Sequence, residues 1–348
     1  MPNIEKNNHG SREIPLVSII IPARNEERRL PSLMRSIRKQ QFKNYEVIVV
    51  DDDSDDDTSS VAKYYGAEVI LAQPINDMPP GKQRACASGA IQAKGEWLLF
   101  LDADVKLVSE HSLEQFLSTY HTYQCKGILS LQPYHQTGKF YENLSAVFSV
   151  IVIAGMNVFS IWRDKFKTAG SFGPVILCDR ISYFQSGGHE AAEDSIMDDF
   201  ALSDLFTRNH LPVNNILGYG YFTLRMYPEG IKSLIEGWTK NLATASQSTH
   251  PFIMMLVIFW VLGGLISIIP FLYAVIYGDV ILIIIAFSAY ILFGISVYRR
   301  VHGAGDFSRW TVLIYPLFFM FFVFIYSYSF FRTHVLKSVK WKGRNIKL

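Results

Sequence analysis

Three long segments without a charged residue lie in the last third of the chain and restrict most strongly how it can fold. They cover residues 252–277, 280–298 and 311–331 and contain no Asp, Glu, Lys or Arg. At about 1.5 Å per helical residue, each is long enough to approach a hydrocarbon core of about 30 Å. The apolar share of the 348 residues is 49%, and it is spread unevenly. We therefore predict a membrane domain over residues 246–348, after a water-soluble domain.

The charges around these segments predict a side of the membrane. Residues 1–15 are polar and lack the apolar core of a secretory signal, so we expect the first domain to stay in the cytosol. Residues 299–310 carry three Arg against one Asp, and residues 332–348 carry six Lys or Arg and no acid. Such basic segments favour the cytoplasmic side and anionic lipid. The expected location is the plasma membrane, multi-pass, with the soluble domain on the cytoplasmic side.

Three full crossings would conflict with this orientation, because they would place the basic tail outside. We expect the third segment not to cross, since Pro316 interrupts it and a re-entrant or interfacial helix fits there. An external tail is the alternative. Residues 144–162 are also uncharged, but they lie between two clusters that should share one site. We expect an interfacial or buried helix there and not a further span.

The soluble part, residues 16–245, alternates strands and helices. Predicted strands at residues 16–22, 45–51, 67–72 and 97–101 are continuous apolar runs, and helical patterns separate them. Fully apolar strands between helices are typical of a Rossmann-like, doubly wound α/β domain whose mostly parallel sheet is covered on both faces. Ligands of such sheets bind at the carboxyl ends of the strands. The polar clusters of this sequence follow those ends.

Two aspartates, Asp102 and Asp104, come directly after the fourth predicted strand. Carboxylates are hard oxygen ligands that suit Mg²⁺ or Mn²⁺, and such an ion often shares its coordination with a diphosphate. The ion would neutralise a leaving diphosphate. A solvated turn is the alternative, although the buried strand before these residues favours a metal site.

Further polar groups follow the other strands. Asn25 and Glu26 open a helix whose free N–H groups can meet a nucleotide, and helix capping explains them equally well. Residues 79–85 contain Lys82 but lack the spaced glycines and the Ser or Thr of a phosphate loop. We expect Lys82 to meet a phosphate only as a point charge.

The run from Asp51 to Asp57 holds six aspartates in seven positions. A calcium loop of the EF-hand type needs Gly at its sixth position and Glu at its twelfth. Whether the positions are counted from Asp51 or from Asp53, this run has neither residue in place. Asp51 and Asp52 end a buried strand, so we expect them to accept hydrogen bonds from uracil or ribose. Asp55 to Asp57 are expected to start the next helix.

Taken together, the motifs SIIIPARNEERRL (18–30), VIVVDDDSDDDT (47–58), GKQRACASGA (81–90) and WLLFLDADV (97–105) resemble the nucleotide-binding half of family 2 glycosyltransferases of the GT-A fold. Later motifs include SLQPYH (130–135), RMYPEG (225–230), EGWTK (236–240) and WKGR (341–344). These are similar, more narrowly, to membrane-bound glycosyltransferases of diaponeurosporenoate, a carotenoid acid. The resemblance runs from about residue 16 to 345.

The resemblance implies a role for several of these positions. The residues implied to hold the uridine are Ala23, Glu26 and one of Asp51 and Asp52. Asp102 and Asp104 would bind the metal, with Lys82 near the diphosphate. The family usually has Gly where this chain has Asp53, a change that a turn tolerates because Asp enters left-handed conformations more readily than most residues.

The catalytic base is less sharply defined. Residues 187–202 offer Glu193, Asp194, Asp198 and Asp199 as candidates, and the Glu-Asp pair of the family matches Asp198 and Asp199 best, with Asp199 at the base position. In an inverting transferase this carboxylate removes the hydroxyl proton of the acceptor. Glu193 and Asp194 are better explained by the helix dipole. A carboxylic acid acceptor is already ionised at pH 7, so Asp199 would then orient the acceptor or the sugar hydroxyls.

Residues 225–242 lead into the first apolar segment. Processive relatives carry Gln-x-x-Arg-Trp in this region, whereas this chain keeps Trp238 but has Gly237 and Leu234 at the other two positions. This departure favours a single transfer over polymer synthesis, and Lys240 can replace the missing cation. Trp238 and Lys240 are therefore candidate donor-binding residues. An interfacial helix with an aromatic anchor is the alternative.

These features predict an enzyme that moves a hexose, glucose, from a UDP-sugar to a membrane-embedded lipid. The expected reaction is metal-dependent and inverting, and the expected acceptor is an apocarotenoid carboxylic acid. Polyprenyl phosphate, diacylglycerol or another lipid is the alternative acceptor, and a non-catalytic membrane anchor is the alternative from another class. The expected partners are the UDP-sugar, the lipid and the membrane, and no nucleic acid. A transporter is disfavoured because the apolar segments hold no ionisable Asp, Glu, Lys or Arg.

Overall fold

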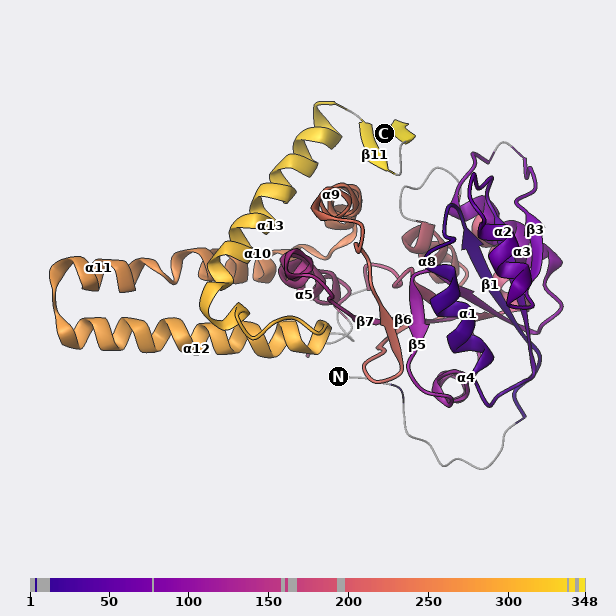
Figure 1. Cartoon of the computed structure of the whole chain (residues 1–348), viewed down its shortest axis with the longest axis horizontal. Helices are drawn as coiled ribbons and strands as arrows, with labels where there is room; N and C mark the ends of the chain where they lie inside the picture. The colour runs from indigo at the N-terminus through magenta and orange to yellow at the C-terminus, as the bar shows by residue number, and fades with distance from the viewer. Residues whose placement is uncertain are drawn as a thin grey trace. The chain divides into compact units, whose positions relative to one another are not determined.

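The computed structural model (Figure 1) describes residues 4, 13–76, 78–157, 160–161, 168–192, 198–336, 338–341 and 344–347. The chain forms two units. The first comprises Met1–Tyr134 and Gly170–Leu224, and the second comprises His135–Ala169 and Arg225–Leu348. Each is described below by itself.

The first unit is built on a seven-stranded sheet in the order β3-β2-β1-β4-β8-β6-β9. Its strands are β1 (Val17–Ala23), β2 (Tyr45–Asp51), β3 (Glu68–Leu71), β4 (Trp97–Leu101), β6 (Ile128–Gln132), β8 (Val175–Asp179) and β9 (Val213–Leu217). The four strands from β3 to β4 are parallel, and so is the pair β6 and β9. Only β8 runs antiparallel to its neighbours. The predicted α/β fold with a mostly parallel sheet is confirmed.

Helices cover this sheet, and the central strands β1 and β4 are almost completely buried. They are α1 (Leu30–Arg38), α2 (Thr58–Tyr64), α3 (Lys82–Gln92), α4 (Ser112–Thr122), α6 (Arg180–Gln185), α7 (Gly188–Ala191) and α8 (Asp198–Arg208). A buried cluster on one face joins strands β1, β2 and β4 to α3, α6 and α8. Gly89 lets α3 approach the sheet closely, since a Cβ there would overlap Ile20. A short second sheet pairs β5 (Val105–Leu107) antiparallel to β10 (Phe222–Leu224).

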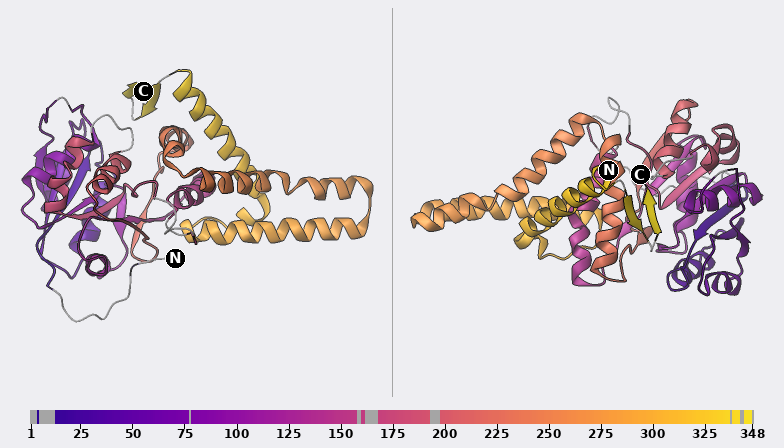
Figure 2. Two further views of the ribbon diagram at one scale, coloured as in Figure 1. Left: turned by 180° about the vertical axis from the view of Figure 1, so that it is seen from behind. Right: turned by 90° about the horizontal axis from the view of Figure 1, so that it is seen from above.

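The second unit is helical. After β7 (Tyr134–His135), where the chain leaves the first unit, it contains a 3₁₀ turn (Phe140–Ser145), α5 (Ala146–Gly155), α9 (Ile231–Ser248), α10 (Pro251–Ile266), α11 (Ile269–Tyr277), α12 (Val280–Ala304) and α13 (Thr311–His334). A β-hairpin of β11 (Ser338–Trp341) and β12 (Arg344–Lys347) follows. Helices α10 and α11 run in one direction and α12 returns beside α11, as the left view in Figure 2 shows.

Three helical stretches in the described part of the chain are long and apolar enough to cross a membrane: Pro251–Tyr277, Val280–Ala304 and Thr311–Thr333. They contain the three predicted segments. The apolar stretch from residue 144 forms a helix that ends at Gly155, which is too short to be a candidate span. The expected helix is confirmed, whereas its placement outside the membrane span stays a prediction, and residues 158–159 and 162–167 lie outside the described residues.

The boundary between the units differs from the predicted one near residue 245. Helices α5 and α9 belong to the second unit. Their apolar faces pack into one buried cluster with the last helices, in which Phe148 and Trp238 lie beside Phe322. Sequence patterns gave no sign of this, because neither the uncharged α5 nor the amphipathic α9 shows in its own residues which partner covers its apolar side chains.

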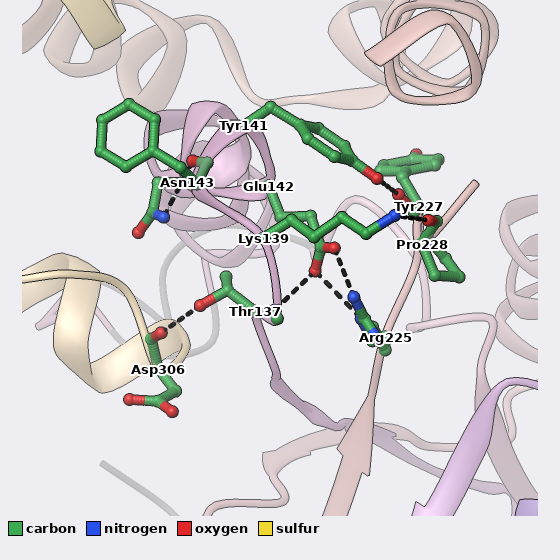
Figure 3. A network of polar contacts seen from close by, with 11 residues as sticks. Thr137, Lys139, Tyr141, Glu142, Asn143, Arg225, Tyr227, Pro228 and Asp306 are labelled. Atoms are coloured by element: carbon green, nitrogen blue, oxygen red, sulfur yellow. Dashed lines mark hydrogen bonds and ion pairs between the residues drawn. The ribbon is translucent and has the colours of Figure 1, made fainter. Parts of the chain in front are cut away.

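A polar network joins three distant segments of the second unit (Figure 3). The Glu142 carboxylate accepts from Arg225 Nη2 at 2.7 Å and Nε at 3.1 Å, and from the Gly138 N–H at 2.8 Å. The Thr137 hydroxyl donates to the carbonyl of Asp306 at 2.6 Å, between α12 and α13. The network therefore fixes the segments at which the chain enters this unit, directly after Tyr134 and after Leu224.

Candidate functional site

The predicted ligand-binding groups of the first unit lie at the carboxyl ends of three neighbouring strands. Strand β1 ends at Ala23, β2 ends at Asp51 and β4 is followed by Asp102. Because β2, β1 and β4 are adjacent and parallel, these ends meet at one edge of the sheet. The backbone also connects them, since the Asp52 N–H donates to the Ala23 carbonyl at 2.9 Å.

The loops after β1 and β2 hold each other in place. The Asn25 N–H donates to the Ser54 hydroxyl at 3.1 Å, and the Asp55 N–H donates to the Asn25 side chain at 2.9 Å. The Glu26 N–H donates to the Thr58 hydroxyl at 2.8 Å. Asn25 and Asp53 have positive φ, 54° and 63°. The prediction that a turn accommodates Asp53 in place of Gly is confirmed.

Different members of the acidic run make different contacts. Asp51 accepts from the Ser54 N–H at 2.9 Å and from the Ser59 hydroxyl. Asp52 is 4% exposed, and its Oδ1 lies 3.0 Å from Arg84 Nη2. Asp56 accepts from the N–H of Thr58 at 3.0 Å. Burial alone would raise the pKa of Asp56, but hydrogen bonds from Thr58 and Glu27 lower it below its ordinary value.

The expected start of α2 is partly confirmed. Asp57 is the residue before the helix, but its side chain makes no capping hydrogen bond. Asp55 and Asp56 instead join the two loops, through the bond from Asp55 to Asn25 and a bond from the Glu27 N–H to Asp56 at 3.2 Å. These later aspartates therefore rigidify the edge of the site.

Lys82, the first residue of α3, reaches the aspartates after β4. Its Nζ lies 2.6 Å from Asp102 Oδ1 and 3.3 Å from the Gly173 carbonyl. Both side chains are about one-third exposed, 35% and 29%, so a ligand can reach them. The sequence placed a cation near a predicted phosphate, and the structure puts that cation against the predicted metal ligand.

The carboxylates of Asp102 and Asp104 suit a divalent cation. Burial, and then the charge of Asp102, raise the pKa of Asp104 to about 7. A cation between the two groups would remove this repulsion and hold both in the ionised form. No group of three or more His, Cys, Asp or Glu forms a complete cation site within the described residues. Oxygens of a diphosphate or of water would have to complete the coordination.

Asp199 reaches the same place from α8. A Cβ added to Gly173 would lie 2.7 Å from Asp199 Oδ2. Because Lys82 also donates to the carbonyl of Gly173, this glycine brings the predicted base and the predicted phosphate-binding lysine to one point. The side chain of Asp198, the first residue of α8, lies outside the described residues, and so do Glu193 and Asp194.

A buried polar network fixes the segment that contains Gly173. The Asn215 amide donates to the Gly170 carbonyl at 2.9 Å, and the Phe172 N–H donates to the Ser130 hydroxyl at 2.7 Å. The Ser171 hydroxyl donates to the backbone carbonyl of Asp199 at 2.9 Å. Ser130, Ser171 and Asn215 are almost completely buried. The segment and the first turn of α8 are thus held together, which orients the Asp199 carboxylate.

Trp238 and Lys240 lie on α9 of the second unit. The Trp238 ring is 3% exposed and stacks on Phe148, with centroids 4.7 Å apart, and its N–H donates to the Ser145 hydroxyl at 2.9 Å. These contacts show a packing role for Trp238. Lys240 is half-buried. Donor binding by these two residues stays a prediction.

Sequence reasoning overlooked two residues of this edge, Arg84 and Gly173. Arg84 follows Lys82 by two positions on α3 and neutralises the buried Asp52. Its position in the first turn of a helix next to a predicted phosphate-binding lysine was the available signal. Gly173 had none, because its importance comes from a side chain 26 positions later in the sequence.

Comparisons with known proteins agree with this geometry. Residues 18–192 match the sequence model of the family "Glycosyl transferase family 2". Proteins named 4,4'-diaponeurosporenoate glycosyltransferase from Staphylococcus aureus strains USA300 and NCTC 8325 are 38% identical over 335 residues, 95% of this chain and 88% of theirs. A solved mannosyltransferase of Pyrobaculum calidifontis, in complex with GDP-mannose and Mn²⁺, has a TM-score of 0.53 and 14% identity, covering 96% of this chain and 90% of that one.

Proposed function

The chain belongs to glycosyl transferase family 2, with a GT-A-like α/β domain followed by three apolar helices, and from this we propose that it transfers glucose from UDP-glucose to a membrane-embedded apocarotenoid carboxylic acid. The single observation that carries the choice of acceptor is the 38% identity, over 95% of the chain, to proteins named diaponeurosporenoate glycosyltransferases. The metal requirement, the inversion and the UDP donor are part of the proposal.

In this proposal the edge of the sheet binds the donor. One of Asp51 and Asp52 accepts from the uridine, together with Ala23 and Glu26, and the ion pair with Arg84 orients Asp52. Asp102 and Asp104 would hold Mg²⁺ or Mn²⁺, which supplies positive charge to the leaving diphosphate. Lys82, 2.6 Å from Asp102, lies close enough to add its own charge to the same oxygens.

Asp199 has a role that depends on the acceptor. A carboxylate acceptor attacks the anomeric carbon with an oxygen that is already ionised at pH 7. It forms the new C–O bond on the face opposite the departing UDP, and no proton has to be removed. Asp199 then orients the acceptor or the sugar hydroxyls. An alcohol acceptor, in contrast, needs Asp199 to remove its proton.

The reaction itself is the first test. Membranes containing the full chain are incubated with radiolabelled UDP-glucose, Mn²⁺ and diaponeurosporenoate, and the lipid extract is analysed for a labelled, alkali-labile glucosyl ester. We expect the ester to form, to disappear with a chelator and to return with added Mg²⁺ or Mn²⁺. Label that enters a lipid present without added carotenoid would instead support polyprenyl phosphate, diacylglycerol or another lipid as the acceptor.

Replacing Asp199→Asn tests the role of that carboxylate. Acceptors of the same length that end in a carboxylate or in an alcohol are compared with both proteins. We expect transfer to the alcohol to fall by about 10²–10⁴-fold and transfer to the carboxylate to fall much less. Equal losses with the two acceptors would contradict the proposed division of roles.

The membrane location is also part of the proposal. A long apolar acceptor dissolves in the bilayer and a nucleotide sugar in the cytosol, so the enzyme has to work at their boundary. The three apolar helices support attachment, and the basic segments 299–310 and 332–348 support a cytoplasmic side for the catalytic domain.

A further inference from the structure

The second unit indicates how many times the chain crosses the bilayer. We infer that α10 to α12 form one hairpin that crosses and returns, and that α13 enters only part of the way and leaves on the side where the hairpin began. This inference rests on the membrane attachment in the proposed function but not on the sugar or the acceptor.

The hairpin has a tight turn and a regular register. Gly278, with φ 69°, ends α11, and the Asp279 carboxylate caps α12 by accepting from the N–H groups of its first turn at 2.9 and 3.0 Å. Phe271 and Phe287 pack with ring centroids 5.5 Å apart. Further from the turn, a Cβ on Gly263 would touch the Phe293 ring at 3.4 Å. Both pairs join positions nearly equally distant from the turn, so the two arms are aligned along their length.

The arms match the thickness of a bilayer. By this register, residues 259–277 lie opposite residues 280–298, with 19 residues in each arm. At about 1.5 Å per residue each arm is about 28 Å long, close to a hydrocarbon core of about 30 Å. Neither arm contains Asp, Glu, Lys or Arg, and the next two residues of the returning arm are Arg299 and Arg300. Many large apolar side chains of both arms are exposed, as lipid-facing residues are.

Helix α13 begins beside the middle of α12 and not at its end. The Tyr290 hydroxyl donates to the Leu313 carbonyl, and Gly294 has no room for a side chain because the Val312 carbonyl occupies that space. After this contact the chain bends, since Ile314 has non-helical angles and Pro316 lies inside the helix. The start of α13 therefore lies within the depth of the hairpin.

From there α13 runs towards the open end of the hairpin. Its contacts in chain order are Tyr315 with Ser267 (2.7 Å, hydroxyl to hydroxyl), Phe319 with Trp260 (4.8 Å between centroids), Phe322 with Phe148 (5.0 Å between centroids) and Ser329 with the Thr239 carbonyl (2.6 Å). Ser267 lies at the end of α10 and Trp260 nearer its start, whereas Thr239 lies on α9, which precedes α10. Although α13 is long enough to span, it does not pass the tip of the hairpin.

The connections to the first unit lie at the same open end. Thr137, just after the chain enters the second unit, donates to Asp306 beyond the last turn of α12, and Asn143 accepts from the Ser308 N–H at 2.7 Å. The open end of the hairpin, the end of α13 and the chain leading to the catalytic unit should therefore share one side, with Asp279 on the other.

Labelling of single cysteines tests this arrangement in the full chain. Lys39→Cys in the first unit, Asp279→Cys at the tip and Leu336→Cys after α13 are each introduced together with Cys125→Ser, because Cys125 is the partly exposed native thiol. Sealed vesicles of both orientations are treated with a membrane-impermeant maleimide. We expect Lys39→Cys and Leu336→Cys to label in one orientation and Asp279→Cys only in the other.

Two outcomes would overturn the inference. Labelling of Leu336→Cys together with Asp279→Cys would mean that α13 crosses. Labelling of Asp279→Cys together with Lys39→Cys would mean that the hairpin does not cross. Neither result depends on a sugar donor or an acceptor, so a failure of this topology is distinguishable from a failure of the proposed reaction, which is read from the labelled ester.

Discussion

The acidic residues of this chain show that the number of carboxylates does not identify a metal site. Asp51 to Asp57 outnumber the pair Asp102 and Asp104, yet their contacts are with Ser, Thr and Arg side chains and with backbone N–H groups. The pair after β4 lies beside a lysine, and burial, followed by repulsion from Asp102, raises the pKa of Asp104 to about 7. A raised carboxylate pKa marks a place where a bound cation would stabilise the ionised form.

Replacing Asp102→Asn should therefore remove transfer almost completely. The change keeps the shape of the side chain but removes the charge that a cation needs, and we expect the initial rate to fall by at least about a hundredfold. Asp204→Asn, a surface carboxylate paired with Arg208, is the matched control and should keep its rate. Rates are measured with radiolabelled UDP-glucose. If the two variants lose activity equally, Asp102 has no special role.

Gly173→Ala should impair catalysis without unfolding the protein. The new methyl group would lie 2.7 Å from Asp199 Oδ2, so the carboxylate has to move. We expect kcat with the alcohol acceptor to fall by about tenfold to a hundredfold, with little change in KM for the UDP-sugar and in Tm. Gly303→Ala is the control, because nothing lies within 4 Å of a Cβ at that position. An unchanged kcat for Gly173→Ala would show that the position of Asp199 is not critical.

At the level of elements, the ion pair of Glu142 and Arg225 connects the 3₁₀ turn to the segment before α9. Burial raises the pKa of Glu142, but hydrogen bonds from Arg225 and Gly138 lower it further than burial raises it. Because the folded pKa lies below the ordinary value of 4.5, the stabilisation is complete above that value and is lost as the pH falls through the lower, folded pKa.

Arg225→Met should accordingly destabilise the protein, since it leaves the buried Glu142 carboxylate unpaired. We expect the free energy of unfolding to fall by about 2 kcal/mol. Breaking a fully buried pair costs about 3–5 kcal/mol, and the cost is smaller here because the Arg225 side chain is 40% exposed. Arg208→Met, whose pair with Asp204 is on the surface, should cost less than about 1 kcal/mol. Thermal unfolding in detergent at pH 7 compares the two. A similar Tm for both would contradict a stabilising role of the network.

The chain as a whole combines a GT-A-like α/β unit with a helical unit that contains three candidate membrane spans. If the helical hairpin is inserted, attachment depends on apolar area and not on the basic tail alone. We expect carbonate at pH 11 and 1 M salt, which weaken electrostatic contacts, to leave the protein in the membrane fraction after sedimentation. Release of the protein by salt would show that only the charges hold it there.

Much of this architecture was readable without coordinates. Four strand positions, the polar groups at their ends and the three apolar segments follow from local patterns, because strand burial and membrane solubility depend on the composition of a short window. The boundary between the units was not readable in this way, since the partners that cover α5 and α9 lie far along the chain. The part of Trp238 in packing emerged only from its stack on Phe148 and its bond to Ser145.

The order and spacing of the motifs along the chain were sufficient to identify the family and the mostly parallel sheet, because these depend on short runs of neighbouring residues. They also led to the prediction of Asp102, Asp104, Lys82 and Asp199 as site residues. The tertiary structure alone joined Lys82 and Asp199 at Gly173, paired Arg84 with Asp52 and turned α13 back beside α10. Such contacts bring together side chains from distant parts of the chain, and their geometry is set by the packing of whole elements, on which a local pattern carries no information.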